Sequence, residues 1–448
     1  MAASDLLLPL LGSADVAAIF ADDARLQAML DFEAALAAAE AECGVIPAPA
    51  AGAIAAACRL DALDLAGFAA AAAAAGNLAI PLVKRLTAAV AARDREAARF
   101  VHWGATSQDA IDTGLMLQLR AALDPIDGAL TRLADALADL ARTHRRTVMI
   151  GRTWLQHALP ITLGLKAAGW LDAVERHRAR LAALRPRLLV LQFGGAAGSL
   201  AALGDRGLDV AAALARELDL ALPDLPWHGQ RDRIAELGAL LGLVVGTLGK
   251  LARDVSLLMQ TEVGEAFEPA GEGRGGSSTM PHKRNPVTGA AVLAAAVRAP
   301  GLVATLMAAQ VQEHERGLGG WHAEWVALPE LVILAAGALD QCADLVAGLE
   351  LDPARMRANL EITNGLIMAE AVTMALGASM GRLEAHHKVE AACRRAVAEQ
   401  RHLRVVLADD PAIAGALDTA ALDRLFDPAN YLGVADAFIA RVLAARRN

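Results

Sequence analysis

Cysteine is scarce in this chain, and its distribution excludes two kinds of site. Among 448 residues there are four cysteines, Cys43, Cys58, Cys342 and Cys393. None belongs to a CxxC pair, and histidine and cysteine residues do not cluster at the spacing of metal ligands. Scattered thiols of this kind are typical of buried side chains in a reducing cytoplasm. We therefore expect a cytoplasmic protein with no metal ion and no other cofactor.

Aromatic residues are also few, at 3% of the chain, whereas hydrophobic residues as a class reach 55% and alanine is abundant. Alanine and leucine are strong helix formers, and the aromatic and β-branched enrichment typical of strands is missing. The composition therefore predicts an almost entirely α-helical fold. Because small side chains let helices approach closely, we expect closely packed helix bundles.

The sequence lacks both a long uncharged apolar segment suited to a membrane and a surplus of basic residues. Its longest uncharged run, Leu65 to Val83, contains Gly76, Asn77 and Pro81, which do not suit a membrane-spanning helix. No basic residue precedes the apolar run of the N-terminus, so this run does not resemble a signal peptide. A net charge of −9 argues against nucleic-acid binding. We expect a soluble protein that binds neither membranes nor nucleic acids.

What the chain does contain is a series of long helical patterns. They predict long helices over residues 22–43, 114–147, 231–268, 286–312 and 324–349. The pair Asp352-Pro353 predicts a further helix start, with proline in the first turn.

The clearest repeat lies in residues 231–268. Apolar residues recur there at alternating spacings of three and four, namely at Ile234, Leu237, Leu241, Val244, Leu248, Leu251, Val255 and Leu258. Such a seven-residue repeat predicts a helix that packs nearly parallel to its neighbours. Gly238, Gly242 and Gly246 would permit very close helix contact, although glycine costs helix stability. We expect a central helix bundle that continues across subunits.

A glycine-rich, hydroxyl-rich and cationic loop separates two of these apolar stretches. Residues 275–286 read GGSSTMPHKRNP. The glycines let the backbone come close to a ligand, while the two prolines limit its freedom. His282, Lys283 and Arg284 form a local cluster of potential cations in an acidic protein, which suits a small anionic substrate. An ordinary solvated loop is the alternative interpretation of this composition.

The segment GSSTMPHKRNP closely resembles the signature loop of the fumarase/aspartase superfamily. The resemblance implies an all-α, three-domain fumarase/aspartase-like fold with a central long-helix bundle. The three domains would cover residues 1–108, 109–350 and 351–448. It further implies a homotetramer whose active sites combine segments from three subunits.

The reactions of this superfamily share a carbanion that is delocalised into a neighbouring carboxylate. By resemblance, Ser277 moves the proton at that carbon, while Lys283 and Asn285 stabilise the developing negative charge. Ser278 and Met280 of the same loop are expected to contact the substrate. Because a serine hydroxyl holds its proton tightly, Ser277 needs nearby positive charge and closure of the loop to act.

A second segment, residues 101–113, reads VHWGATSQDAIDT and resembles the first substrate-contacting segment of the superfamily. Thr106 and Ser107 suit the start of a helix, where hydroxyls and free N–H groups form an anion site. By resemblance they would hold a substrate carboxylate, with His102 close by.

Two shorter segments carry further polar residues. WHGQRD at 227–232 resembles the family segment in which a glutamine and an arginine, here Gln230 and Arg231, face the substrate. QEHERGLGGW at 312–321 resembles the HER segment of adenylosuccinate lyase and its cycloisomerase relatives, and includes Arg316.

The segment GRTWLQHALP at 151–160 departs from the family pattern at one position. Hydratases and lyases of the superfamily have a histidine where this chain has Trp154. Thr153 and Gln156 are retained and are expected to hydrogen-bond the substrate. His157 either contacts a carboxylate and takes part in catalysis, or is an ordinary polar residue of the bundle.

Tryptophan at this position fits one branch of the superfamily. A lyase that expels hydroxide or an amine needs a general acid, whereas a carboxylate, with a pKa near roughly 4, leaves without protonation. GRTWLQHALP and the run RLQAMLDFEAALAAAEAECGVIP resemble the bacterial 3-carboxy-cis,cis-muconate cycloisomerase branch. The implied reaction is lactonisation of 3-carboxy-cis,cis-muconate to 4-carboxymuconolactone in protocatechuate degradation, the β-ketoadipate pathway. Expected counter-groups for this tricarboxylate are Arg316, Lys283, Arg231, Thr106, Ser107 and Gln230.

Two other interpretations remain open. One is an adenylosuccinate- or argininosuccinate-type lyase that eliminates fumarate, although such an enzyme would need a general acid at position 154. The other is a non-catalytic structural homologue, which would have no need of Ser277, Lys283 and Asn285.

Overall fold

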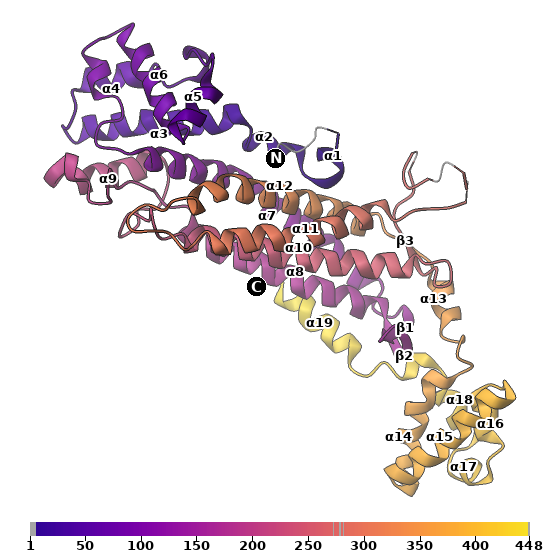
Figure 1. Ribbon diagram of the computed structural model, residues 1–448. Helices are drawn as coiled ribbons and strands as arrows, with labels where there is room; N and C mark the ends of the chain where they lie inside the picture. The colour runs from indigo at the N-terminus through magenta and orange to yellow at the C-terminus, as the bar shows by residue number, and fades with distance from the viewer. Residues whose placement is uncertain (1–5, 272, 277–278, 281, 447–448) are drawn as a thin grey trace. The chain divides into compact units, whose positions relative to one another are not determined.

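The structure, a computed structural model, describes residues 6–271, 273–276, 279–280 and 282–446. It confirms the all-α prediction, because long helices dominate the described chain (Figure 1). The six longest helices are α3 (Asp22–Glu42), α7 (Ser107–Thr143), α8 (Leu163–Leu188), α10 (Asp232–Leu258), α11 (Val287–Ala308) and α12 (Gly320–Ala347). The helix predicted over 231–268 is therefore shorter than expected and ends at Leu258.

The chain divides into two compact units. The first unit comprises residues 1–131, 177–249 and 291–341. The second unit comprises residues 132–176, 250–290 and 342–448. The three-domain division at residues 108 and 350 stays a prediction.

The N-terminal part of the first unit is built around α3. Its shorter helices are α1 (Leu8–Leu11), α2 (Ala14–Ile19), α4 (Ala48–Ala55), α5 (Phe68–Ala75), α6 (Ala79–Ala91) and α9 (Gly207–Glu217). Helix α3 packs against α4 and α9 (Figure 1). The apolar side chains of Met29, Leu30, Phe32 and Leu36 are almost completely buried there. Two acidic residues, Glu33 and Glu40, are buried on the same helix.

The predicted heptad seam of α10 is confirmed. All eight apolar residues of the repeat, from Ile234 to Leu258, are buried. A methyl group added at Gly238 would lie 2.6 Å from Leu306, and one added at Gly242 would lie 2.8 Å from Val303. These two glycines therefore allow α11 to approach α10 closely. Gly246 differs, because a methyl group there would meet no atom within 4 Å.

Among the residues that the structure describes, three helices, α10, α11 and α12, are long and apolar enough to cross a membrane by length and composition alone. None of them contains the uncharged run from Leu65 to Val83, which the structure divides between α5 and α6. The apolar windows of α10 and α12 are 61% and 72% buried within the protein. The window of α11 is 28% buried, so this helix presents apolar side chains such as Val297 on the surface of the chain.

The second unit contains two small antiparallel sheets that composition did not predict. Strands β1 (Val148–Thr153) and β2 (Gln156–Thr162) form a hairpin, and β3 (Ala266–Phe267) pairs with β4 (Glu350–Leu351). Trp154 and Leu155 form the two-residue turn of the hairpin, with positive φ values of 53° and 63°. Two successive positive φ values are characteristic of a type I′ turn, whose twist matches that of paired strands.

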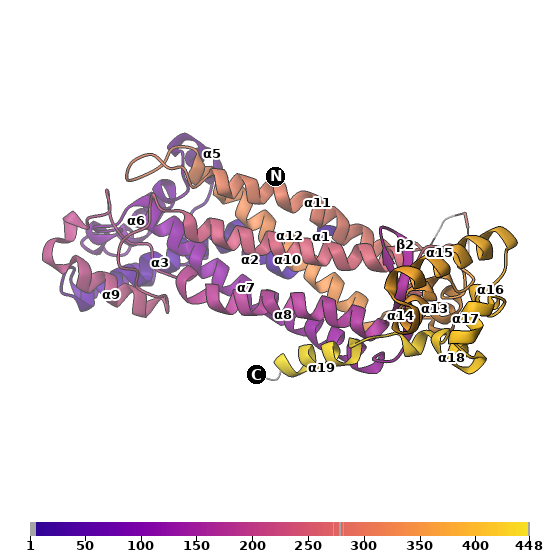
Figure 2. The ribbon, with the colours of Figure 1, turned by 90° about the horizontal axis from the view of Figure 1, so that it is seen from below.

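The C-terminal part of the second unit consists of shorter helices. They are α13 (Pro353–Asn359), α14 (Ala369–Met380), α15 (Arg382–Glu399), α16 (Leu403–Ala408), α17 (Pro411–Ala416), α18 (Thr419–Leu425) and α19 (Ala435–Ala445). The predicted start of α13 is confirmed, since the Asp352 side chain accepts a hydrogen bond from the Arg355 N–H. Helices α14 to α18 gather around a small core that includes Leu376, Val389 and Val406 (Figure 2).

Candidate functional site

The segment before α7 holds His102 in a defined position. His102 has a positive φ of 58°, an uncommon conformation for a residue other than glycine. Its Nδ1 lies 2.6 Å from Oε1 of Glu33 on α3. The His102 side chain is 17% exposed and that of Glu33 is 1% exposed. An imidazole at the edge of the protein is thus fixed by an acidic group from the interior.

The start of α7 is anchored by Asp109. The Oδ2 atom of this carboxylate accepts hydrogen bonds from the N–H groups of Thr106 and Gly195. Its Oδ1 atom accepts from the N–H of Gly194 and lies 2.7 Å from Nε2 of His228. Both carboxylate oxygens of Asp109 thus have hydrogen-bond partners, and Asp109 joins the start of α7 to the loop that contains Gly194 and Gly195. This confirms a helix start at the predicted position, while carboxylate binding by Thr106 and Ser107 stays a prediction.

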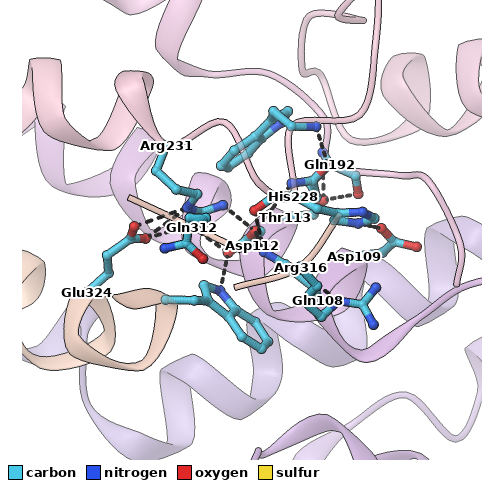
Figure 3. A network of polar contacts seen from close by, with 12 residues as sticks. Gln108, Asp109, Asp112, Thr113, Gln192, His228, Arg231, Gln312, Arg316 and Glu324 are labelled. Carbon is cyan, nitrogen blue, oxygen red and sulfur yellow. Dashed lines mark hydrogen bonds and ion pairs between the residues drawn. The ribbon is translucent and has the colours of Figure 1, made fainter. Parts of the chain in front are cut away.

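Arg231 lies inside the first unit, between two carboxylates (Figure 3). Its Nη1 is 2.7 Å from Oδ2 of Asp112, and its Nη2 is 2.6 Å from Oε2 of Glu324. The guanidinium also lies over the ring of Trp227, at 4.7 Å from the ring centroid. Burial by itself would lower the pKa of Arg231, but the two carboxylates outweigh burial and raise it. The arginine is therefore a permanent buried cation.

In the single chain this arrangement turns the Arg231 guanidinium inward, and substrate contact by Arg231 stays a prediction. The Arg231 side chain is 0% exposed, and Asp112 and Glu324 occupy its donor groups. Two carboxylates buried without a cation would cost several kcal/mol, which explains why the arginine turns inward. Its sequence neighbour Gln230 is exposed.

Arg316 is positioned by the same network (Figure 3). Its Nε donates to Oε1 of Gln108 at 3.0 Å, and its Nη2 donates to the carbonyl of Ala196 at 3.2 Å. Gln108 is itself held by Oδ2 of Asp112 and the carbonyl of His228. No residue that the structure describes accepts from the remaining N–H groups of Arg316. The structure therefore links Arg316 to the start of α7, where His102, Thr106 and Ser107 lie.

The signature loop belongs to the second unit. Ser277 and Ser278, which are predicted to transfer a proton and to contact the substrate, lie outside the described residues. At the base of the loop, the N–H of Asn285 donates to the carbonyl of Gly275 at 2.8 Å. Lys283 is exposed, and its ammonium group forms no ion pair with a described residue. Met280 is 40% exposed.

The loop is followed by a firmly capped helix. Glu268 accepts hydrogen bonds from the N–H groups of Thr288 and Gly289 in the first turn of α11. Arg284 donates to the carbonyl of Glu268 at 2.7 Å and pairs with Glu350 at 2.9 Å. The C-terminal side of the loop is thereby tied to the second unit.

The β1–β2 hairpin carries the remaining predicted residues. Thr153 and Gln156 pair across its turn, and both are exposed. Trp154, at the tip, is 97% exposed. His157 is half-buried, and its Nδ1 is buried without a hydrogen-bond partner among the described residues.

An ion pair lies beside His157. Arg152 forms a bidentate ion pair with Glu265, with its Nη1 2.9 Å from Oε2 and its Nη2 2.7 Å from Oε1. The side-chain amide of Asn359 donates a hydrogen bond to the same carboxylate. Burial lowers the pKa of His157, and so does Arg152, while Glu265 opposes them. At neutral pH the imidazole is thus uncharged. Such a group can accept a proton or hydrogen-bond a substrate, and both interpretations of His157 remain open.

Several polar residues that organise these segments were not predicted from the sequence. The most important are Glu33, Gln108, Asp112, Glu265, Glu268 and Glu324, all of them buried. One signal was available for Glu33, since it is an acidic residue within the apolar stretch of α3. Nothing in the sequence named the partners of these groups. In the part of the chain that the structure describes, no group of three or more His, Cys, Asp or Glu side chains is arranged to hold a metal ion.

Comparison with known sequence families agrees with the motifs. Residues 13–301 match the family described as lyase. Residues 365–442 match the family described as adenylosuccinate lyase C-terminus. The first match covers more than half of the chain and includes the α7 start, the hairpin and the signature loop.

Individual proteins are similar over nearly the whole length. The chain is 62% identical to the 3-carboxy-cis,cis-muconate cycloisomerase of Pseudomonas aeruginosa, with 96% of this chain and 94% of that protein covered. It is 58% identical to the protein of the same name from Bradyrhizobium diazoefficiens, with 99% and 98% covered. The crystal structure of the 3-carboxy-cis,cis-muconate lactonizing enzyme from Pseudomonas putida matches with a TM-score of 0.94 and 55% identity, over 99% of both chains. Together with the family match, this similarity shows that the chain belongs to the lyase family of the fumarase/aspartase superfamily.

Proposed function

We propose that this protein is an intramolecular lyase that lactonises 3-carboxy-cis,cis-muconate to 4-carboxymuconolactone in protocatechuate degradation. The observation that carries the proposal is its 62% identity over 432 residues to a cycloisomerase of that name. Trp154 supports the same reaction, because a carboxylate leaving group in the reverse, eliminating direction needs no general acid.

In the proposed lactonisation, one substrate carboxylate adds to the conjugated alkene. A C–O bond forms at one alkene carbon, and the electron pair moves toward the other carbon and into the carboxylate attached to it. Lys283 and Asn285 stabilise this negative charge. The Ser277 hydroxyl then protonates the carbon and regains its proton from solvent.

We assign recognition of the three substrate carboxylates to a small set of groups. Arg316 has N–H groups that no described residue occupies, and Lys283 has an exposed ammonium group. Thr106 and Ser107 lie at the start of α7, where the helix dipole favours an anion. Further substrate contacts are assigned to His102, Thr153, Gln156, His157, Gln230, Ser278 and Met280. Arg231 supports the site from inside the protein.

We further propose a homotetramer with shared active sites. Val297 of α11 is 81% exposed in the single chain, and Trp154 and Leu155 at the hairpin tip are 97% and 77% exposed. Large apolar side chains that are exposed in a single chain are often covered at protein interfaces. Light scattering during size-exclusion chromatography tests this directly, with four times the mass of one chain as the expected result.

We also propose a cytoplasmic location, no cofactor, and domains over residues 1–108, 109–350 and 351–448. The four cysteines support the location, since all are free and three are buried. The apolar face of α11 is assigned to the tetramer and not to a membrane.

The activity is tested by an ultraviolet assay that follows loss of the conjugated diene of 3-carboxy-cis,cis-muconate. We expect rapid loss that is unchanged by EDTA, because no metal takes part in the proposed steps. Absence of reaction would refute the cycloisomerase proposal, and adenylosuccinate and argininosuccinate would then be the next substrates to assay.

A further inference from the structure

The ion pair between Glu33 and His102 joins a buried helix to the edge of the candidate site. Glu33 lies in the middle of α3, 69 positions before His102 in the chain. The 2.6 Å separation of Glu33 Oε1 and His102 Nδ1 is short for a hydrogen bond between an imidazole and a carboxylate. The other oxygen of Glu33, Oε2, is buried without a hydrogen-bond partner among the described residues. The imidazole is therefore the group that balances this carboxylate.

The charged groups around His102 all favour its protonated form. Burial by itself would lower the pKa of His102, but Glu33 raises it through its charge and its hydrogen bond, and Asp109 adds to this effect. The net result is a raised pKa.

Two other titratable groups face Glu33. Burial, together with the neighbouring charge of Glu33, raises the pKa of Glu40 to about 9, so this carboxyl is neutral at pH 7. Burial, aided by Glu33 and Asp31, also raises the pKa of the Cys58 thiol, which stays uncharged. Neither group is a cation, and His102 is the only ion-pair partner of Glu33 among the described residues.

The geometry also defines which proton of the imidazolium is available. Both nitrogens of a protonated histidine carry hydrogen. Since Nδ1–H is donated to Glu33, Nε2–H is the free donor, and no described residue accepts a hydrogen bond from it. His102 lies five residues before Ser107, the first residue of α7, where the positive end of the helix dipole also attracts anions.

We propose that Glu33 is a positioning residue that keeps His102 as an oriented imidazolium, whose Nε2–H binds a substrate carboxylate at the start of α7. The inference deepens the proposed function and depends on it for the identity of the substrate. His102 then has one defined role, that of a cationic hydrogen-bond donor to a substrate carboxylate. This role depends on Glu33, which does not touch the substrate.

The first test measures the protonation of His102 without any turnover. The chain has 11 histidines, so the His102 resonance of ¹³C-histidine-labelled enzyme is assigned by comparison with His102→Gln. We expect the pKa of His102 to lie above 6.5, the ordinary histidine pKa, in the wild-type enzyme. In Glu33→Gln we expect this pKa to fall to 6.5 or below. A wild-type value at or below 6.5, or an unchanged value in Glu33→Gln, would overturn the proposal.

Glu40→Gln is the matched control. It makes the same chemical change on the same helix, seven residues further along, where the carboxyl is buried but neutral at pH 7. We expect the titration of His102 to be preserved in this variant. If Glu33→Gln fails to fold, Glu33→Asp keeps the charge, and the wild-type titration still decides the first step.

The second test measures carboxylate binding and kinetics. A non-reacting tricarboxylate, tricarballylate, should shift the His102 resonance in the wild-type enzyme, and its binding should weaken in Glu33→Gln. With 3-carboxy-cis,cis-muconate, Glu33→Gln should raise KM by roughly tenfold or more with a smaller effect on kcat, since a hydrogen bond to a charged group is lost. The rise of KM with pH should begin at lower pH in this variant. In a His102→Gln background, Glu33→Gln should have no further effect on KM, and an equal effect there would contradict action through His102.

The two proposals fail in different ways. If the enzyme does not react with 3-carboxy-cis,cis-muconate but His102 titrates and binds tricarballylate as described, the proposed function is wrong and the role of Glu33 stands. If lactonisation is rapid but Glu33→Gln leaves the His102 titration unchanged, the role of Glu33 is wrong and the proposed function stands.

Discussion

The guanidinium of Arg231 forms a bidentate ion pair with Asp112. Both side chains are almost completely buried, and the two residues are 119 positions apart in the chain. Glu324 binds the other side of the same guanidinium. One cation thus holds two carboxylates that come from different helices, α7 and α12.

We expect Arg231→Met to lower the free energy of unfolding by about 3–5 kcal/mol, because it leaves two buried carboxylates without a cation. Arg206→Met is the matched control. The exposed pair of Arg206 with Asp209, at 3.3 Å, should contribute less than about 1 kcal/mol. Urea denaturation followed by circular dichroism measures both. Lost activity with unchanged stability in Arg231→Met would instead support the sequence-based prediction of substrate contact.

The buried carboxyl of Glu40 should make the free energy of unfolding depend on pH in an unusual way. Its pKa is raised to about 9, primarily by burial and then by Glu33, whereas the carboxyl in the unfolded chain has its ordinary value of 4.5. The folded protein therefore keeps a proton that the unfolded chain releases. The stabilising contribution is complete below pH 4.5 and is lost as the pH rises toward 9.

We expect Glu40→Gln to remove this loss, because glutamine is neutral at every pH and has nearly the same shape. The variant should be more stable than the wild type at pH 8, by on the order of a few kcal/mol, with a smaller difference at pH 5. Denaturation curves at several pH values measure the difference. Glu42→Gln, which alters an exposed carboxylate on the same helix, should leave the pH dependence unchanged.

The close contact of α10 with α11 gives a third pair of matched variants. A methyl group added at Gly249 would lie 2.7 Å from Cβ of Ala296, whereas one added at Gly246 would meet no atom within 4 Å. Gly249→Ala should destabilise the protein by about 1–3 kcal/mol through overpacking. Gly246→Ala should gain up to about 1 kcal/mol of helix propensity. Thermal unfolding compares the two, and equal effects would contradict the close approach of these helices.

We expect substitutions in the signature loop to lower the activity without unfolding the protein. Ser277→Ala should lower kcat by roughly 10²–10⁴-fold, because the proton donor is removed. Lys283→Met should lower kcat by roughly 10²–10³-fold, because stabilisation of the developing charge is lost. The ultraviolet assay measures both, and circular dichroism and light scattering confirm that fold and assembly are retained. Wild-type turnover in Ser277→Ala would rule out the assigned mechanism.

Local sequence patterns determined much of the architecture. The heptad of α10 predicted which eight residues are buried, because burial along a helix repeats with the helical period. Asp352-Pro353 predicted the start of α13, because capping depends on neighbouring residues alone. The signature loop identified the superfamily for the same reason, since its residues are consecutive in the chain.

The polar interior could not be predicted in this way. Arg231 was expected to face the substrate, and only the structure shows that Asp112 and Glu324, 119 and 93 positions away, enclose it. The hairpin of β1 and β2 was likewise missed, because composition reports average propensity and not which segments pair. The sequence by itself determined the helical fold, the heptad seam and the family. Only the tertiary structure decided which charges are buried and which partner each one has, since the cost of a buried charge depends on residues that meet only when the chain folds.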